Sequence, residues 1–459
     1  MSSLGIFDKE TKTYKKVADL SKPAVIDSSM SDTSTNAVQN KVVKSYVDNG
    51  LNTLKKSVSD GKTTVANAIT AKGVTTATDA TFATMASNIS KITTGVDTSD
   101  ATATAAQILT GKTAYVKGSK VTGTLGTKTD IIRTDPTTLR TSRQDLAGAS
   151  VGNYALFAGG TNHTGSIEST VDAYDSSLAR TNPNALRTAR RNLAGASVGN
   201  YALFAGGTTG SSDSTVDAYN SSLTRSTPQA LSTARSYLAG ASVGNYALFA
   251  GGYNSGAKSE VDAYNSSLAR ITPMTLSTAR SYLAGASVGN YALFAGGEKS
   301  SYKSTVNAYD SSLARSTPTA LSTARSYLAG ASVGDYALFA GGTTTNGSTD
   351  STVDAYNSSL TRSTPPALST ARSHLAGASV GNYALFAGGA KSEVDAYDSS
   401  LARSTAPALS TARSHLAGAS VGNYALFAGG ITITNGSIES TVNAYERPHI
   451  SIPAQKIYL

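Results

Sequence analysis

The sequence contains neither cysteine nor tryptophan. Without cysteine there is no disulfide framework, no thiolate metal site and no cysteine nucleophile, so the fold does not depend on the redox state of its surroundings. Only four histidines occur, and none stands in an H-x-E or H-E-x-x-H pattern. We therefore expect neither a metal site nor a cofactor.

Long apolar runs and concentrated charge are also missing. No stretch approaches the ~20 apolar residues of a membrane span. The start, MSSLGIFDKETKTYKK, lacks the basic and apolar regions of a secretory signal. The net charge of +9 is diffuse, since only 15% of residues are charged and no basic run occurs. These features predict no membrane insertion, no signal peptide and no nucleic-acid partner.

What the sequence has in abundance is repetition. The stretch LAGASVGNYALFAGG occurs seven times, with six identical copies and one in which Asp335 replaces Asn. The copies begin at Leu146, Leu193, Leu238, Leu283, Leu328, Leu375 and Leu416, which gives spacings of 47, 45, 45, 45, 47 and 41 residues. A period near 45 is typical of a four-stranded propeller blade and is long for a leucine-rich or ankyrin unit.

One repeat contains four candidate strands, which we name a, b, c and d. Strand a, Tyr237–Ser242, is rich in small residues, and strand b, Tyr246–Gly252, ends in two glycines that tolerate positive φ. Strand c, Glu260–Tyr264, alternates apolar and polar residues, and strand d, Leu268–Thr272, is followed by a proline. We expect the small residues of strand a to line a propeller axis and the large residues of strand b to pack between blades.

The ends of the repeat region predict how the ring closes. Strands a, b and c occur seven times, but the pattern stops after Tyr445 and leaves the last unit without a strand d. The segment Ile131–Leu146 aligns without a gap to Leu178–Leu193 and is therefore an orphan strand d. We predict a mainly β fold in which residues 131–459 form a seven-bladed β-propeller, closed by this N-terminal strand, with a C-terminal tail over 446–459.

The repeat resembles the kelch repeat. The resemblance rests on the Gly-Gly after strand b, the Tyr of strand c and the Arg before strand a, for example Arg235. Kelch units usually carry a Trp after the strand-c Tyr. In this chain leucines stand at that place: Leu178, Leu223, Leu268, Leu313, Leu360 and Leu401.

The seven copies also show where the unit varies. The b–c loops differ in length and sequence, and their candidate binding residues are Asn162, His163, Thr209, Asp213, Tyr253, Asn254, Lys258, Glu298, Lys299, Tyr302, Lys303, Asn346, Asp350, Lys391 and Asn435. The position directly before the leading Leu of strand a varies as well: Asp145, Asn192, Tyr237, Tyr282, Tyr327, His374 and His415. Both sets belong on one face of a meander, which is the arrangement of a binding surface on a fixed scaffold.

Other interpretations stay open, both for the variable residues and for the charged residues that recur in the blades. Surface loops can drift because nothing constrains them, although the opposite face has hardly drifted. The repeated Arg180, Arg190 and Asp172 could suggest catalysis, but they recur in nearly every blade, whereas an active site is built once. The polar loops suit hydroxyl-rich ligands such as surface glycans, with Tyr taking the stacking role of the absent Trp.

The first 130 residues follow a different pattern. Residues 31–58 read as a helix, with apolar residues at three- to four-residue steps from Val43 to Val58. Residues 80–92 carry a short apolar stripe at helical spacing, and residues 113–125 read as a hairpin turning at 117–120. Two such stripes without a large core favour self-association.

Segments of this region resemble bacteriophage tail proteins. The matching stretches are TSTNAVQNKVV, VANAITAKGV followed by DATFATMASNI, and AAQILTGKTAYVKGSKVTGTL, which together span roughly residues 31–126. The resemblance implies a tail fibre or receptor-binding protein of a phage or phage-derived particle, made in the bacterial cytoplasm without a signal peptide. It further implies attachment to a tail or baseplate protein through residues 1–30, and oligomerisation, with a trimer favoured, through a stalk over residues 31–130.

The function expected from all of these features is adhesion. The propeller would bind a receptor on the host-cell surface through its variable face, and a glycan is the expected kind of receptor. Two alternatives remain: a structural baseplate or stalk component whose propeller binds other virion proteins, and a glycan-degrading propeller enzyme.

Overall fold

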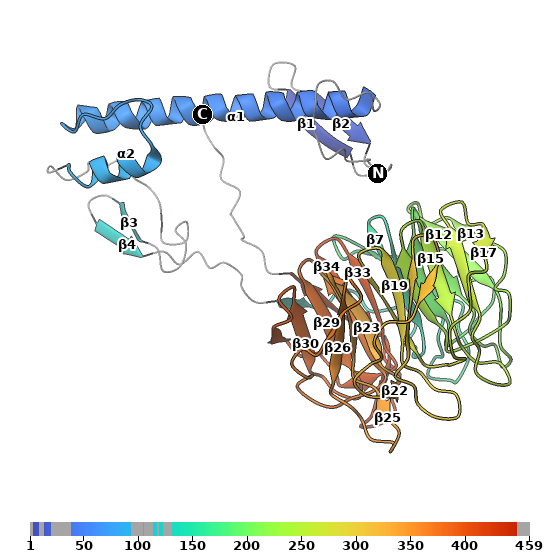
Figure 1. Cartoon of the computed structure of the whole chain (residues 1–459). Helices are drawn as coiled ribbons and strands as arrows, with labels where there is room; N and C mark the ends of the chain where they lie inside the picture. Colours follow the sequence, from blue (N-terminus) through green and yellow to red (C-terminus); the bar gives the residue numbers. More distant parts are fainter. Residues whose placement is uncertain are drawn as a thin grey trace. The chain divides into compact units, whose positions relative to one another are not determined.

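The computed structural model describes residues 3–8, 13–19, 38–92, 104, 113–116, 119–122 and 131–447. The chain divides into two compact units, and the second spans Thr127–Ser451. This second unit is a seven-bladed β-propeller, as the sequence predicts (Figure 1). The described residues are mainly β and contain two helices, both in the first unit.

Each blade is an antiparallel sheet of four strands in the order a, b, c, d. Strand a is Ala147–Val151 (β6), Ala194–Val198 (β10), Ala239–Val243 (β14), Ala284–Val288 (β18), Ala329–Val333 (β23), Leu375–Val380 (β28) and Ala417–Val421 (β33). Strand b is Tyr154–Ala158 (β7), Tyr201–Ala205 (β11), Tyr246–Ala250 (β15), Tyr291–Ala295 (β19), Tyr336–Ala340 (β24), Tyr383–Gly388 (β29) and Tyr424–Ala428 (β34).

Strands c and d complete the blades, which we number 1 to 7 along the chain. Strand c is Val171–Asp175 (β8), Val216–Asn220 (β12), Val261–Asn265 (β16), Val306–Asp310 (β20), Val353–Asn357 (β26), Val394–Asp398 (β30) and Val442–Glu446 (β36). Strand d is Arg180–Thr181 (β9), Arg225–Ser226 (β13), Arg270–Ile271 (β17), Arg315–Ser316 (β21), Arg362–Ser363 (β27), Arg403–Ala406 (β31) and, in blade 7, Ile132–Thr134 (β5). Two short ribbons add Arg325–Ser326 (β22) with Thr343–Thr344 (β25), and Arg413–Ser414 (β32) with Ile431–Thr432 (β35).

The ring closes through the N-terminal strand. Strand β5 pairs with β36, so that Thr134 lies opposite Ala444 and Arg133 lies opposite Tyr445. Ile131 is buried in the apolar cluster between blades 6 and 7. The predicted closure is therefore confirmed, and it joins segments about 300 residues apart in the chain.

Apolar contacts hold the blades to one another. Between blades 2 and 3, Leu203 and Ala218 lie in one buried cluster with Phe249 and Tyr264. The rings of Phe249 and Tyr264 meet edge to face at 6.0 Å. Leu248 points the other way, into the cluster shared with blade 4. Alternate residues of strand b thus fill the two neighbouring interfaces, as the period-2 geometry of a strand requires.

Neighbouring strands a come very close at the axis. A Cβ added to Gly195 would lie 2.1 Å from the carbonyl oxygen of Gly148 in the preceding blade, which explains why this position is always glycine. The Gly, Ala and Ser in the middle of each strand a line a narrow central space of about 210 Å³. The expectation that small residues line the axis is confirmed.

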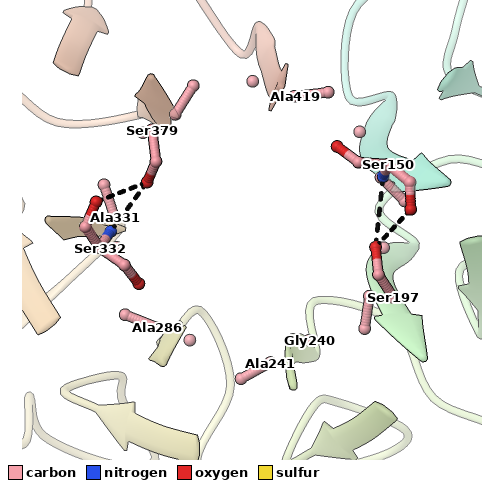
Figure 2. Close-up of a pocket in the computed structure, with 18 of the residues that line it drawn as sticks. Ser150, Ser197, Gly240, Ala241, Ala286, Ala331, Ser332, Ser379 and Ala419 are labelled. Atoms are coloured by element: carbon pink, nitrogen blue, oxygen red, sulfur yellow. Dashed lines mark hydrogen bonds between the residues drawn. The ribbon is translucent and has the colours of Figure 1, made fainter. Parts of the chain in front are cut away.

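The serines of strand a form a closed ring of hydrogen bonds around this space. Each Ser Oγ donates to the Ser carbonyl of the preceding blade, over 2.5–2.7 Å, and the ring closes from Ser150 to Ser420. Each Oγ also accepts from the Ser amide of the preceding blade, as Figure 2 shows between Ser150 and Ser197 and between Ser332 and Ser379. At the closing step, the amide of Ser420 donates to Ser150 Oγ.

The observed strand boundaries differ from the predicted ones where a residue adopts the left-handed conformation with positive φ. Strand a begins at Ala239 because Tyr237 has φ 53°. Strand b ends at Ala250 because Gly251 and Gly252 have φ of 65° and 112°. Strand d is only Arg270–Ile271, since Leu268 lies in the c–d turn with φ 62°.

The described residues of the first unit form two hairpins and two helices. Ser3–Asp8 (β1) pairs with Thr13–Asp19 (β2), and the predicted later hairpin is present as Thr113–Val116 (β3) with Ser119–Thr122 (β4). The first helix, Val38–Ala71 (α1), runs well past the predicted end at Val58. The second, Phe82–Ile89 (α2), is capped by Thr81, whose side chain accepts from the Thr84 amide.

We predict that the closing strand is essential for the stability of the ring. Replacing residues 131–140 by a Gly-Ser segment of the same length should lower the melting temperature in circular dichroism, because strand β36 becomes an open edge and two blade interfaces each lose an apolar side chain, Ile131 between blades 6 and 7 and Leu139 between blades 7 and 1. A comparable Gly-Ser replacement of the surface loop 344–349 serves as the control. An unchanged melting temperature for the 131–140 variant would contradict the closure account.

Candidate functional site

The two variable sets of residues lie on the same face of the propeller. The segment before strand a pairs with the start of the b–c loop of its own blade. In blade 3, the Ser236 amide donates to Tyr253 O (3.1 Å) and the Tyr253 amide donates to Ser236 O (2.7 Å). The same bridge joins Gln144 to Thr161 in blade 1 and Ser281 to Glu298 in blade 4. The predicted convergence of loop and pre-strand positions is therefore present.

The variable residues before strand a form a ring of their own. The backbone amide of each donates to the carbonyl of its counterpart in the preceding blade, over 2.9–3.1 Å, and the bond from Asp145 to His415 closes the circle. All seven residues have φ between 53° and 58°, a left-handed conformation that side chains other than glycine rarely adopt. The closed hydrogen-bonded ring compensates for this conformational cost. Because strand a lines the axis, this ring surrounds one end of the central space.

Five of the seven side chains in this ring stack on one another. The ring centroids of Tyr237 and Tyr282 lie 4.3 Å apart, and those of Tyr282 and Tyr327 lie 4.4 Å apart. The stack continues from Tyr327 to His374 at 4.2 Å and from His374 to His415 at 4.3 Å. The sequence places an aromatic residue or histidine at these positions but does not reveal the stack, because the contacts join residues about 45 positions apart.

The stack changes the proton affinity of its members. Burial, with a further contribution from the positive form of His415, lowers the pKa of His374 to about 4. Burial also raises the pKa of Tyr327 to about 12, and it raises the pKa of Asp145 against the opposing effect of His415. At neutral pH His374 and Tyr327 are therefore uncharged, so this part of the ring presents a neutral, hydrogen-bonding surface.

Several predicted loop residues are engaged within their own loops. Asn162 Oδ1 accepts from the amides of Thr164 and Ser166, and Asn346 and Asn435 make the same kind of turn with Ser348 and Ser437. Such side chains shape their loops as Asx-turns. The same is true of Asp213 and Asp350, which accept from the amides of Thr215 and Thr352, whereas Asn254 donates to Ala234 O in the segment before strand a.

Other predicted residues face the solvent. Tyr253 is 45% exposed, a high value for an aromatic side chain. His163, Thr209, Lys299 and Lys391 are also exposed, whereas Lys258, Glu298, Tyr302 and Lys303 are half-buried. Glu298, Lys299 and Tyr302 line a pocket of about 330 Å³ together with Ser300, Ser301 and Thr345.

The repeated arginines and aspartates are part of the structure of each blade. Arg143 is fully buried and donates to Asp172 Oδ2 (2.6 Å) and to Phe157 O (3.0 Å). The equivalent Arg190–Asp217 pair has the same geometry at 2.8 Å. A second arginine, Arg180, approaches the other carboxylate oxygen of Asp172 at 3.8 Å. Each of the two buried pairs joins strand c to the segment before strand a. Because both side chains are fully buried, they are not exposed to a ligand at the surface.

Two blades depart from this pairing. Strand c carries Asn307 in blade 4 and Asn443 in blade 7, in place of the Asp of the other five blades. Burial lowers the pKa of Arg280 and of Arg413, the arginines of these blades, to about 10. In blade 7 the closing strand supplies a substitute, because Asp135 accepts from Asn443 Nδ2 at 2.7 Å. The change from VDAY to VNAY is the sequence signal for these exceptions.

Comparisons with known proteins add no family assignment. A scan of protein-family models and a search of curated proteins each found no match to this chain. Among the described residues no group of three His, Asp or Glu side chains is placed to hold a metal ion. Neither described helix is long and apolar enough to cross a membrane.

We predict that Asn307→Asp stabilises the propeller. The new carboxylate would pair with the buried Arg280 guanidinium, as Asp262 pairs with Arg235 in the neighbouring blade, and should raise the free energy of unfolding by about 1–3 kcal/mol at neutral pH. Urea unfolding measures this change. The mirror variant Asp262→Asn should be destabilised by a similar amount, and equal stabilities of both variants and the parent would contradict the pairing account.

We also predict a pH dependence that comes from His374. Because its folded-state pKa of about 4 lies below the ordinary 6.5, the unfolded chain takes up the proton first as the pH falls. The contribution to stability is fully present above pH 6.5 and is lost as the pH falls towards 4. His374→Tyr, which places in blade 6 the residue that blade 5 carries, should make stability less dependent on pH over this window. The exposed variant His163→Tyr is the control, and an unchanged profile for His374→Tyr would refute the prediction.

Proposed function

We propose that this chain is an adhesin whose propeller binds a receptor on a host-cell surface through the variable face, and that this receptor is a glycan. The observation that carries the proposal is the division of each blade into a nearly constant scaffold and variable elements that meet on one face. Loop starts and pre-strand residues are joined there by backbone hydrogen bonds, as between Ser236 and Tyr253. A rigid scaffold with variable loops on one side is how many proteins present a binding surface.

The opposite face argues against simple drift. The a–b turn, for example Gly244 and Asn245, is exposed, yet its Gly-Asn sequence is kept in six of the seven blades. Exposure alone therefore does not explain why the b–c loops vary. The loops differ in length from three residues in blade 6 to ten in blade 7, while the flanking strands keep the same register.

The rest of the chain supports a fibre-like adhesin of phage type with kelch-like blades. Helix α1 presents an apolar row at three- to four-residue steps, in which Val47, Leu51, Leu54 and Val58 are 41–60% exposed. We propose that this row joins copies of the chain, a trimer being the favoured state, and that residues 1–30 attach the assembly to a tail or baseplate protein. Several propellers on one particle would raise weak individual affinities by roughly 10²–10⁴ through effective concentration.

The alternative functions make different demands on the propeller. A glycan-degrading enzyme needs reactive side chains that reach a substrate, but the repeated Arg–Asp pairs are enclosed within the blades. A structural component would bind another virion protein rather than a cell. Binding of the full chain to whole bacteria, without release of sugar, distinguishes adhesion from both.

We predict that cell binding depends on the variable face. The labelled full chain is incubated with a panel of bacterial strains, and the triple variant His163→Ala, Thr209→Ala, Tyr253→Ala is compared with the parent on a strain that binds. The three exposed side chains belong to blades 1 to 3, and their loss should reduce binding at least about tenfold, the scale of one or two interface contacts.

The control changes the opposite face. The variant Asn200→Ala, Asn245→Ala, Asn290→Ala alters three exposed a–b turns and should bind as the parent does. Equal binding by both variants, or a loss confined to the control, would show that the variable face is not the receptor-binding surface.

A further inference from the structure

Blade 4 differs from every other blade in the charge around its buried arginine. In blades 1, 2, 3, 5 and 6 the arginine pairs with an Asp of strand c at 2.6–2.8 Å. In blade 4, Arg280 is fully buried and donates to the neutral Asn307 Oδ1 (3.0 Å) and to Phe294 O (3.0 Å). No carboxylate of strand c offsets its charge.

The b–c loop of blade 4 does not supply the missing negative charge either. Just before strand c, blades 1, 2, 5 and 7 carry an acidic residue, and in blade 5 Asp350 lies 3.6 Å from the buried Arg325. Blades 3 and 6 have a lysine there, but a glutamate follows two residues later and strand c keeps its Asp. Blade 4 has Lys303 at this position, Thr305 two residues later and Asn307 in strand c. It therefore has the lysine but lacks both the glutamate and the aspartate. Blade 7, the other blade with Asn, is offset by Glu439 and Asp135.

A pocket opens at this same loop. It measures about 330 Å³ and lies between the b–c loops of blades 4 and 5, lined by Glu298, Lys299, Ser300, Ser301, Tyr302 and Thr345. Lys303 Nζ donates to Ser301 Oγ in its wall (2.9 Å), which holds a second ammonium group beside the pocket. The single acidic group, Glu298, accepts from Ser326 Oγ at 3.2 Å. The pocket therefore combines a positive balance with several hydroxyl groups and one tyrosine.

These features select a class of ligand. Two ammonium groups attract a carboxylate or phosphate, and the hydroxyl groups of Ser300, Ser301 and Thr345 can exchange hydrogen bonds with sugar hydroxyls. The half-buried Tyr302 offers an aromatic surface for a sugar ring. Resting on the proposed adhesive function, we propose that this pocket binds a negatively charged saccharide and thereby makes the variable face selective for acidic surface glycans.

The test compares three probes on the full chain by saturation-transfer NMR titration: glucuronic acid, glucose 6-phosphate and neutral glucose. Glucuronic acid, glucose 6-phosphate or both should bind more tightly than glucose, and the pair of anionic probes shows whether carboxylate or phosphate is preferred. The double variant Lys299→Ala, Lys303→Ala should weaken anionic binding about tenfold, the scale of one charge-assisted hydrogen bond at a partly exposed site. Asn307→Asp, which offsets the buried positive charge of Arg280 in the same blade, should weaken it as well.

A matched control removes the same charge elsewhere. Arg140→Ser, Arg187→Ser also deletes two positive groups, and serine is the residue that the other five repeats carry at these exposed positions. This control should keep the anionic affinity of the parent. An equal loss of anionic affinity in both double variants would show that the overall charge of the chain causes the effect, and it would overturn the pocket assignment.

The remaining outcomes separate this inference from the proposed function. If glucose binds as well as the anionic probes, or no probe binds while the chain still adheres to cells, the binding of acidic saccharides in this pocket is refuted and adhesion stands. If anionic binding is unchanged in both double variants, the site lies elsewhere on the chain. If neither probes nor cells bind, both proposals fail together.

Discussion

The close approach of neighbouring strands a at the axis is the constraint on which the rest of the propeller depends. A Cβ at Gly195 would lie 2.1 Å from the Gly148 carbonyl oxygen, so this position has no room for any side chain. The same proximity lets the strand-a serines and the residues before strand a form two closed rings of hydrogen bonds, one through Ser150 and Ser420 and the other through Asp145 and His415. Both rings require every blade to have the same inner geometry, which explains why the fifteen-residue stretch is repeated so closely.

A constant inner scaffold leaves the outer elements free to differ. The b–c loop begins after two glycines and returns to strand c in the same register whatever its length, so a change in the loop does not disturb the rings. The buried Arg–Asp pair lies at the boundary between the two regions. In blades 4 and 7 the exchange of Asp for Asn alters the charge next to the variable face without changing the sheet, and only blade 7 has an acidic substitute from the closing strand.

Much of this architecture follows from the sequence, because a repeat carries its own alignment. The blade count, the orphan strand d and the shared face of the variable residues could all be predicted from spacing. The left-handed conformation of Tyr237, the stack of Tyr327 on His374 and the enclosure of Arg280 could not, because each depends on distances between neighbouring blades. The prediction also overestimated free polar groups in the loops, since Asn162 hydrogen-bonds within its own turn.

Hydrogen–deuterium exchange tests the central claim most directly. The full chain is measured with and without surface polysaccharide from a bacterium to which it adheres. The account predicts slower exchange in the b–c loops and in the ring of residues before strand a, with unchanged exchange in strands a and b, whose hydrogen bonds are already protected. Protection confined to the a–b and c–d turns, or to residues 1–126, would place the receptor contact elsewhere and contradict the account.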